Sequence, residues 1–128
     1  MYNDDRTMPK SSSQVSGSLA GLVLAVLADM PLHGYGIARE IEQRSADALS
    51  FGEGTLYPAL KTLEKNGFVE GRWDTSSDSG PARKVYEITP EGRKELARVR
   101  LAWREYSRSI DQVLEGSSGS LTRVGDRC

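Results

Sequence analysis

The sequence has few of the residues from which metal centres and enzyme active sites are usually built. Its 128 residues include one histidine, His33, and one cysteine, the terminal Cys128. A single thiol excludes an internal disulfide and favours a reducing compartment. A histidine with no cysteine or second histidine nearby argues against a metal site and favours a turn residue. With no glycine-rich phosphate loop and no paired carboxylates in an expected cleft, we predict no enzyme, no metal and no cofactor.

The sequence also lacks a charge excess and a long apolar run. Its formal net charge is -1, so no bulk field draws it to nucleic acid or membrane. This balance counts mildly against DNA binding, although a local cationic patch would be enough. The longest apolar run, residues 19–27, is well short of the roughly 20 residues that span a bilayer. No secretion signal is evident, so we expect a soluble, cytoplasmic protein of one domain.

The most informative stretch is residues 54–67. Apolar residues at positions 56, 59, 60 and 63 form one stripe of a helix, which Asn66 and Gly67 are suited to end. A capping-box pattern from Ser50 to Glu53 is present, but Pro58 argues for a start nearer Glu53 or Gly54. Glu64 is expected to point away from the outer face. That face carries hydroxyls and two cations but no carboxylate: Thr55, Tyr57, Lys61, Thr62 and Lys65.

Two strand-like runs follow this helix at once. Residues 68–73 and 83–88 predict a hairpin, and the turn-forming residues 74–81 suit a wing with Arg83 and Lys84 at its base. Two further helices are expected before it, at 19–30 and 35–44. A helix with one buried and one cationic face, followed by a hairpin, is typical of a winged helix-turn-helix. The alternative is an ordinary amphipathic helix in a small α+β core.

A long helix is expected from Pro90 to about Glu115, capped by Thr89. Its apolar residues alternate at spacings of three and four, which is the pattern of a heptad seam. A rod of about 25 residues is longer than so small a core covers, so we expect it to pair in a homodimer across a two-fold axis. Packing on the chain's own first helix is the alternative. The expected interface is Leu22, Val26, Leu96, Val99, Trp103, Tyr106, Ile110 and Val113.

The predicted fold is mainly α with a small β-hairpin. It is organised as a flexible tail (1–17), a winged helix-turn-helix DNA-binding domain (18–89), a C-terminal dimerisation helix (90–115) and a disordered tail (116–128).

Four motifs resemble the PadR family of transcriptional regulators: His33–Ile37, Gly54–Leu60, Gly80–Tyr86 and Ile88–Gly92. With a single C-terminal helix and no second helical domain, the predicted organisation resembles the short PadR subfamily. The resemblance implies a bacterial winged-helix homodimer that represses by occupying a promoter palindrome. It also implies release by a planar aromatic or drug-like effector in some members. Trp103 resembles the tryptophan that stacks on such ligands, and Tyr106 lies one helical turn away.

Double-stranded DNA is therefore the expected partner, with contacts from the 54–66 helix, the wing base and the second helix. The expected contact residues are Tyr35, Arg39, Thr55, Tyr57, Lys61, Thr62, Lys65, Arg83 and Lys84. None of them is an evident base-reading fork, so part of the specificity is expected to come from DNA shape. The rival function is a winged-helix protein–protein module without DNA binding. An apolar patch would be more typical of such a module than this carboxylate-free polar face.

Overall fold

The computed structural model describes residues 19–75 and 80–121, with side chains as far as Gly116. The expected 1–17 tail, the capping residue Ser18, the middle of the wing loop and residues 122–128 lie outside the described residues. The chain divides into two compact units, Met1–Ala97 and Arg98–Cys128, which are taken separately below.

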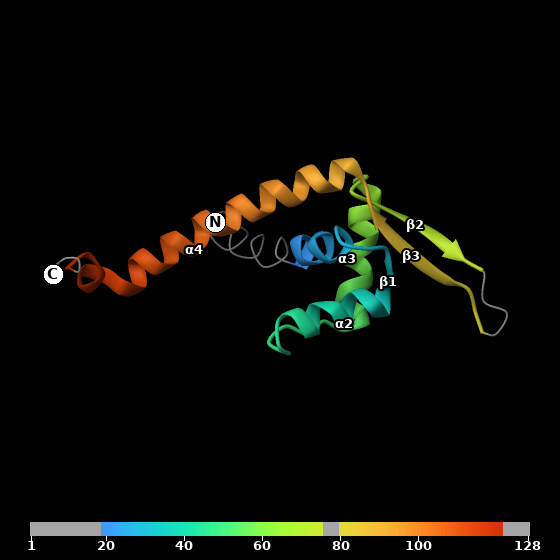
Figure 1. The fold of residues 1–128 in the computed structure, drawn as a ribbon, viewed down its shortest axis with the longest axis horizontal. Coiled ribbons are helices and arrows are strands. Elements are labelled where there is room, and N and C mark those ends of the chain that lie inside the picture. The colour runs from blue at the N-terminus through green and yellow to red at the C-terminus, as the bar shows by residue number, and fades with distance from the viewer. Residues whose placement is uncertain (1–18, 76–79, 122–128) are drawn as a thin grey trace, which may run out of the picture. The chain divides into compact units, whose positions relative to one another are not determined.

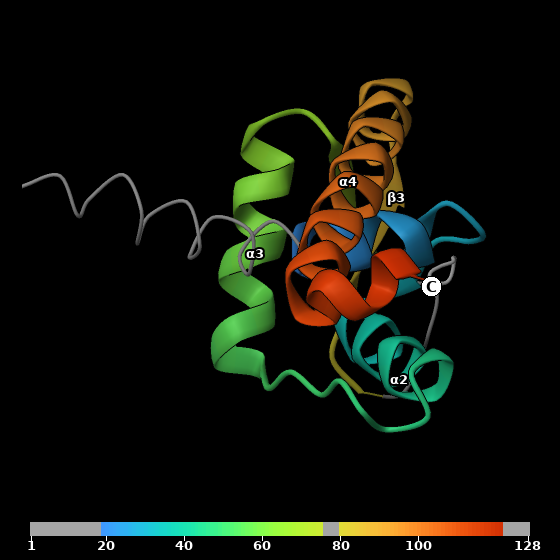
Figure 2. The same cartoon turned by 90° about the vertical axis from the view of Figure 1, so that its left-hand side faces the viewer.

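The first unit contains three helices and a small sheet, followed by the start of a fourth helix (Figures 1 and 2). A helix over residues 19–27 is followed by α2 (Gly34–Arg44) and α3 (Glu53–Lys65). The strands are β1 (Leu32–His33), β2 (Val69–Asp74) and β3 (Arg83–Ile88), and α4 spans Pro90–Leu121. The mainly helical fold with a β-hairpin is confirmed.

The sheet is antiparallel with the order β1-β3-β2. Val69 pairs with Ile88 and Asp74 with Arg83, so the expected hairpin forms with its strands in full register. His33, which was expected in a turn, lies instead in a short strand with Leu32, and Leu32 pairs with Tyr86. β3 is therefore the central strand, and the hairpin that projects in Figure 1 is anchored at its base.

One apolar core lies beneath these elements. Its fully buried side chains come from the first helix, α2, α3 and β2: Val23, Leu24, Leu27, Ile37, Leu56, Leu60 and Val69. Val26 and Leu96 belong to the same core, at 2% and 4% exposure. The expectation that these two residues face a partner is therefore corrected, since the single chain already covers them. The first helix ends at residue 27, earlier than expected, and a turn over residues 28–29 leads to β1.

Helix boundaries follow local hydrogen bonding. α3 begins at Glu53 after Gly52, with no side-chain cap, so the later of the two expected starts is correct. Ser50 Oγ donates to Glu42 Oε2 (3.0 Å) instead of capping α3. The Thr89 hydroxyl caps α4 as expected, accepting from Gly92 N at 3.0 Å and donating to Gly67 O at 2.7 Å.

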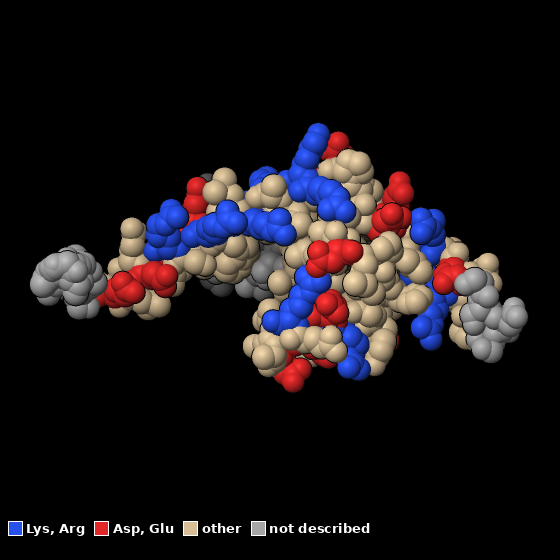
Figure 3. All heavy atoms as spheres, in the orientation of Figure 1, with Lys and Arg blue, Asp and Glu red and all other residues tan. Residues whose placement is uncertain are grey.

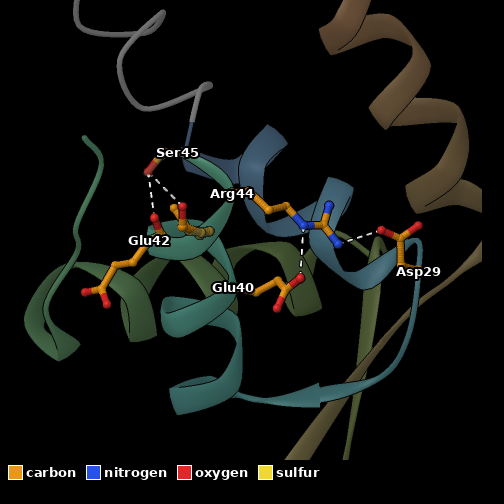
Figure 4. Close-up of polar contacts among 6 residues, drawn as sticks. Asp29, Glu40, Glu42, Arg44 and Ser45 are labelled. Carbon is orange, nitrogen blue, oxygen red and sulfur yellow. Dashed lines mark hydrogen bonds and ion pairs between the residues drawn. The ribbon is translucent and has the colours of Figure 1, made fainter. Parts of the chain in front are cut away.

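A polar clip fixes α2 to the turn after the first helix (Figure 4). Arg44 Nη2 lies 2.5 Å from Asp29 Oδ2, and Arg44 Nε donates to Glu40 Oε2 at 3.2 Å. The hydrogen bonds to Asp29 and Glu40 raise the pKa of Arg44, against the opposing effect of desolvation. Next to this clip, Ser45 Oγ donates to Ile41 O (2.8 Å) and ends α2. These contacts set the course of the α2–α3 connection.

The second unit is the distal part of α4. Its backbone leaves the helical region at Gly116, where φ is 56° and ψ is -146°. Before that point several large apolar side chains are exposed, with exposed fractions of 54% for Leu101, 79% for Val113 and 78% for Leu114. Within residues 19–75 and 80–121, no helix combines the length and apolar character needed to cross a membrane.

Candidate nucleic-acid interface

The outward face of α3 is polar and cationic. Leu56, Leu60 and Leu63 are buried, and at 100° per residue the directly opposite side carries Gly54, Pro58, Lys61 and Lys65. Both lysines are exposed, as are Thr55 and Thr62. Carboxylates on α3 are confined to Glu53 in the first turn and to Glu64, which is engaged elsewhere. An anionic partner approaching this side therefore meets cations and hydroxyls first.

A hollow of about 520 Å³ brings together residues from β1, α2, α3 and both hairpin strands. Four of the nine expected contact residues line it: Tyr35, Tyr57, Arg83 and Lys84. Tyr35 and Arg39 line an adjoining hollow that Tyr57 shares. The structure thus brings expected contact residues as far apart in the sequence as Tyr35 and Lys84, 49 positions, to one hollow that Tyr57 also lines.

Thr55 and Thr62 lie on the other flank of α3. They line a separate, largely apolar hollow together with residues of the first helix and the start of α4. The two threonines and Tyr57 therefore occupy opposite edges of the exposed helix face rather than one cluster, with Lys61 and Lys65 between them.

Tyr35 and Arg39 form a pair on α2. Arg39 Nη1 donates to the Tyr35 hydroxyl at 3.2 Å, and the guanidinium carbon lies 5.9 Å from the centre of the Tyr35 ring. The hydrogen bond to Tyr35 raises the pKa of Arg39, and the guanidinium is exposed. The pair presents a guanidinium supported by an aromatic ring, which suits contact with phosphate.

Gly34 and Tyr57 are in unusually close contact. A Cβ added to Gly34 would lie 2.6 Å from the Tyr57 hydroxyl oxygen and 2.8 Å from its ring carbons Cε1 and Cζ. Gly34 is the first residue of α2 and Tyr57 lies in the second turn of α3. The absent side chain therefore lets the tyrosine ring lie against the start of α2.

Gly34→Ala should destabilise the protein by about 1 kcal/mol, the lower end of overpacking costs, because the atoms that must move are the outer end of the Tyr57 side chain, which is 42% exposed. Urea unfolding measures the loss. The double variant Gly34→Ala, Tyr57→Ala should lose less stability than the sum of the two single variants, because the second change removes the clash. Strict additivity of the two losses would contradict this account.

Lys84 differs from the sequence-based expectation in being engaged within the fold. Lys84 Nζ lies 3.1 Å from Glu64 Oε1, and Glu64 Oε2 accepts from Gly71 N at 3.3 Å. The ammonium also lies 5.6 Å from the Tyr86 ring centre and 5.9 Å from that of Trp73. Sequence reasoning missed this contact because Glu64 and Lys84 are 20 residues apart; the signal was a single carboxylate beside the cationic face of α3.

Tyr86 lies under this cluster at 6% exposure. Burial raises the pKa of the Tyr86 phenol above its ordinary value of 10.0; nearby Lys84 lowers it and Glu64 raises it.

Because the pKa of Tyr86 is higher in the folded protein, its stabilising contribution is present at neutral pH. That contribution should be lost as the pH rises above about 10 and through the folded-state pKa. Urea midpoints measured across this range should fall more steeply for the wild type than for Tyr86→Phe, which cannot ionise. Phenolate absorbance, compared between the two proteins, reports the titration. Identical pH dependence in the two proteins would contradict the prediction.

Charge is distributed unevenly over the visible face of the molecule (Figure 3). Lysine and arginine follow the hairpin and α4, with acidic side chains between them. On α4 the exposed cations are Arg93, Lys94, Arg98, Arg100, Arg104 and Arg108. The near-neutral total charge thus hides local cationic surfaces. Among the described residues, no His, Cys, Asp and Glu side chains are grouped as a metal site would require.

In the second unit, Trp103 and Tyr106 form an edge-to-face aromatic pair. Their ring centres are 5.2 Å apart with an interplanar angle of 81°. Both side chains are half-buried in the single chain. The two residues expected to meet an effector are thus neighbours on one face of α4.

A helical core, an exposed polar helix at the second position of a helix-turn-helix pair, and a hairpin anchored by a third strand define a winged helix-turn-helix protein. The chain belongs to the transcriptional regulator PadR-like family, whose model matches residues 23–98. It is accordingly a transcriptional regulator of the PadR type.

Similar proteins are found among curated sequences and solved structures. The transcriptional regulator Rv3488 of Mycobacterium tuberculosis is 35% identical over 96 residues, covering 75% of this chain and 82% of that protein. A crystal structure of a PadR family transcription regulator from Clostridium difficile has a TM-score of 0.64 and 29% identity, covering 75% of this chain and 97% of the other.

An uncharacterised 37.1 kDa protein of transposon TN4556 from Streptomyces fradiae is 39% identical over 98 residues. The match covers 72% of this chain but only 26% of that protein, so the chain spans about a quarter of its length.

Proposed function

We propose that this regulator is a homodimeric, sequence-specific repressor that binds a promoter palindrome. The observation that carries the proposal is the outward face of α3, where Lys61 and Lys65 are exposed and every carboxylate lies at the margin or is engaged elsewhere. In winged helix-turn-helix dimers this helix enters the major groove, and the half-sites repeat about one helical turn apart. Membership of a family of transcriptional regulators supports the same function.

The proposed contacts fall into three groups. Thr55, Tyr57, Lys61, Thr62 and Lys65 face the groove and its phosphates from α3. Tyr35 and Arg39 contact phosphate from α2, where the ring-supported guanidinium is exposed. Arg83 meets the backbone or minor groove from the base of the wing. Lys84 is not among the proposed DNA contacts, because its ammonium forms an ion pair with Glu64.

The proposed dimer is built on the helical seam without Val26 and Leu96. The exposed apolar side chains of α4 support this assignment, since Val113 is 79% and Ile110 is 40% exposed in the single chain. Exposure of this kind along one helix marks a surface that a partner covers. The remaining proposed interface residues are Leu22, Val99, Trp103, Tyr106, Ile110 and Val113.

The proposal is tested by binding to DNA from upstream of the gene that encodes the chain, measured by fluorescence anisotropy against scrambled DNA at two salt concentrations. Light scattering gives the mass. A dimer with about a hundredfold preference for its own upstream DNA would support the repressor. Equal and strongly salt-dependent binding to both would contradict sequence readout at this promoter. No binding at low salt would favour a protein–protein module instead.

The proposal includes a planar aromatic effector that stacks on Trp103 beside Tyr106. The edge-to-face geometry of this pair leaves ring faces for a flat ligand. Because the chain has two tryptophans, a Trp73→Phe background isolates the emission of Trp103. A panel of planar aromatics and cationic dyes should quench this emission in a saturable manner. A panel without any response would contradict the effector.

A further inference from the structure

Glu64 occupies an unusual position for a carboxylate on a DNA-facing helix. It lies three residues after Lys61 and directly before Lys65, where a negative charge opposes phosphate binding. Its side chain turns toward the hairpin, and it contacts both strands at once. One oxygen meets Lys84 Nζ of β3 at 3.1 Å, and the other accepts from Gly71 N of β2 at 3.3 Å.

Lys84 is correspondingly withdrawn from solvent. Its side chain is 30% exposed and that of Glu64 is 34% exposed, which makes this ion pair more buried than the Arg72–Glu87 pair of the hairpin, at 63% and 46%. The ammonium also lies near the faces of Trp73 and Tyr86, so its charge has two aromatic neighbours besides Glu64.

Gly71 completes the arrangement. A Cβ added there would lie 2.4 Å from Lys84 Cε and 3.2 Å from Glu64 Oε2. The lysine stem therefore crosses β2 in the space that a side chain would fill. Glycine, carboxylate and lysine form one latch between α3 and the hairpin, defined here as Glu64, Gly71 and Lys84.

We propose that Glu64 is a positioning residue that sets the recognition helix and the wing in one fixed arrangement, with Lys84 as its internal counter-ion rather than a phosphate contact. This inference rests on the proposed DNA-binding function. It explains why a carboxylate is found beside Lys61 and Lys65: the groove-reading helix and the wing must reach DNA together, and preformed geometry avoids an ordering cost on binding.

If Glu64 belongs to a latch, removing its charge should change DNA affinity in the opposite direction from that expected for a simple surface charge. Removing an unengaged carboxylate near DNA should strengthen binding. Removing a latch should weaken it, because the wing and helix are no longer held for simultaneous contact. Glu64→Gln should therefore weaken binding to the upstream DNA about tenfold, the scale of one charge-assisted hydrogen bond. Lys84→Met, which keeps an unbranched stem, should weaken it by a similar factor.

The experiment measures affinity and its salt dependence for Glu64→Gln, Lys84→Met and the double variant. Glu87→Gln serves as the matched control, because it breaks an ion pair within the hairpin that does not reach α3. Both single variants should keep the wild-type salt slope, and the double variant should bind no more weakly than the weaker single variant. Glu87→Gln should bind like the wild type. Circular dichroism checks that each variant is folded.

Amide hydrogen exchange provides a readout that is independent of DNA. The Gly71 amide should exchange about tenfold faster in Glu64→Gln than in the wild type or Glu87→Gln, because its charged acceptor is lost. Unchanged exchange at Gly71 would overturn the latch.

On DNA, tighter binding by Glu64→Gln would overturn the positioning role, as would a salt slope reduced by about one in Lys84→Met, which marks a lost phosphate contact. A wild type that binds no DNA would instead overturn the proposed function, so the two failures are distinguishable.

Discussion

Gly92→Ala should destabilise the protein by about 3 kcal/mol or more, at the upper end of overpacking costs. A Cβ at this position would lie 2.1 Å from Phe68 O and 2.7 Å from Ile88 Cγ1. The first of these neighbours is backbone, and the same carbonyl accepts from Thr89 N at 3.0 Å. Relief would require moving either the start of α4 or the entry to β2, and both are fixed by the sheet and the Thr89 cap.

Gly54→Ala is the matched control for this prediction. Gly54 lies inside α3 with nothing within 4 Å of the added Cβ, so alanine should be neutral or stabilise by up to about 1 kcal/mol through helix propensity. Urea unfolding should give a midpoint well below that of the wild type for Gly92→Ala, and a midpoint at or above that of the wild type for Gly54→Ala. Equal midpoints for the two variants would show that close approach at Gly92 carries no energetic consequence.

Replacing Lys61 and Lys65 together by alanine should reduce DNA affinity by about 10- to 100-fold at moderate salt. Both lysines lie opposite the buried stripe of α3, where a groove-bound helix meets phosphates. Each phosphate contact contributes nearly one to the slope of log affinity against log salt, so the slope should fall by about two. Affinity measured over a series of salt concentrations gives both quantities.

Lys94→Ala controls for the loss of one positive charge outside the proposed interface. Lys94 is an exposed lysine of α4 whose Nζ lies 3.7 Å from Glu91 Oε2. The Lys94→Ala variant should keep the salt slope of the wild type. If the Lys61 and Lys65 double variant kept the wild-type slope, neither lysine would be at the phosphate backbone, and the proposed docking of α3 would be wrong.

Local patterns account for most of the elements that were predicted. The apolar stripe of α3 and the Thr89 cap depend on residues within a few positions of one another, and both are found as the sequence indicates. The exception is β1. Two residues carry no periodicity, and Leu32 becomes a strand only because it pairs with Tyr86, 54 positions later. Such pairing is set by tertiary structure.

The candidate site was harder to predict from the sequence than the elements were, for the same reason. The exposed side of α3 follows from helical spacing alone. The engagement of Lys84 depends on how β3 lies against α3, and the burial of Val26 and Leu96 depends on how much cover the core provides. A sequence pattern identifies which residues are apolar or charged. It does not say which of them are buried or paired within the folded chain. The proposed contacts and interface remain predictions on this basis.

The strand order has a consequence for how copies of the protein meet. With β3 in the centre, the sheet ends in β1 and β2. β1 has only two residues, too few to template a further strand. β2 exposes Glu70 and Arg72, and charged side chains on an edge discourage strand addition. Both borders are thus protected against edge-to-edge aggregation, which is compatible with the proposed dimer on helical surfaces.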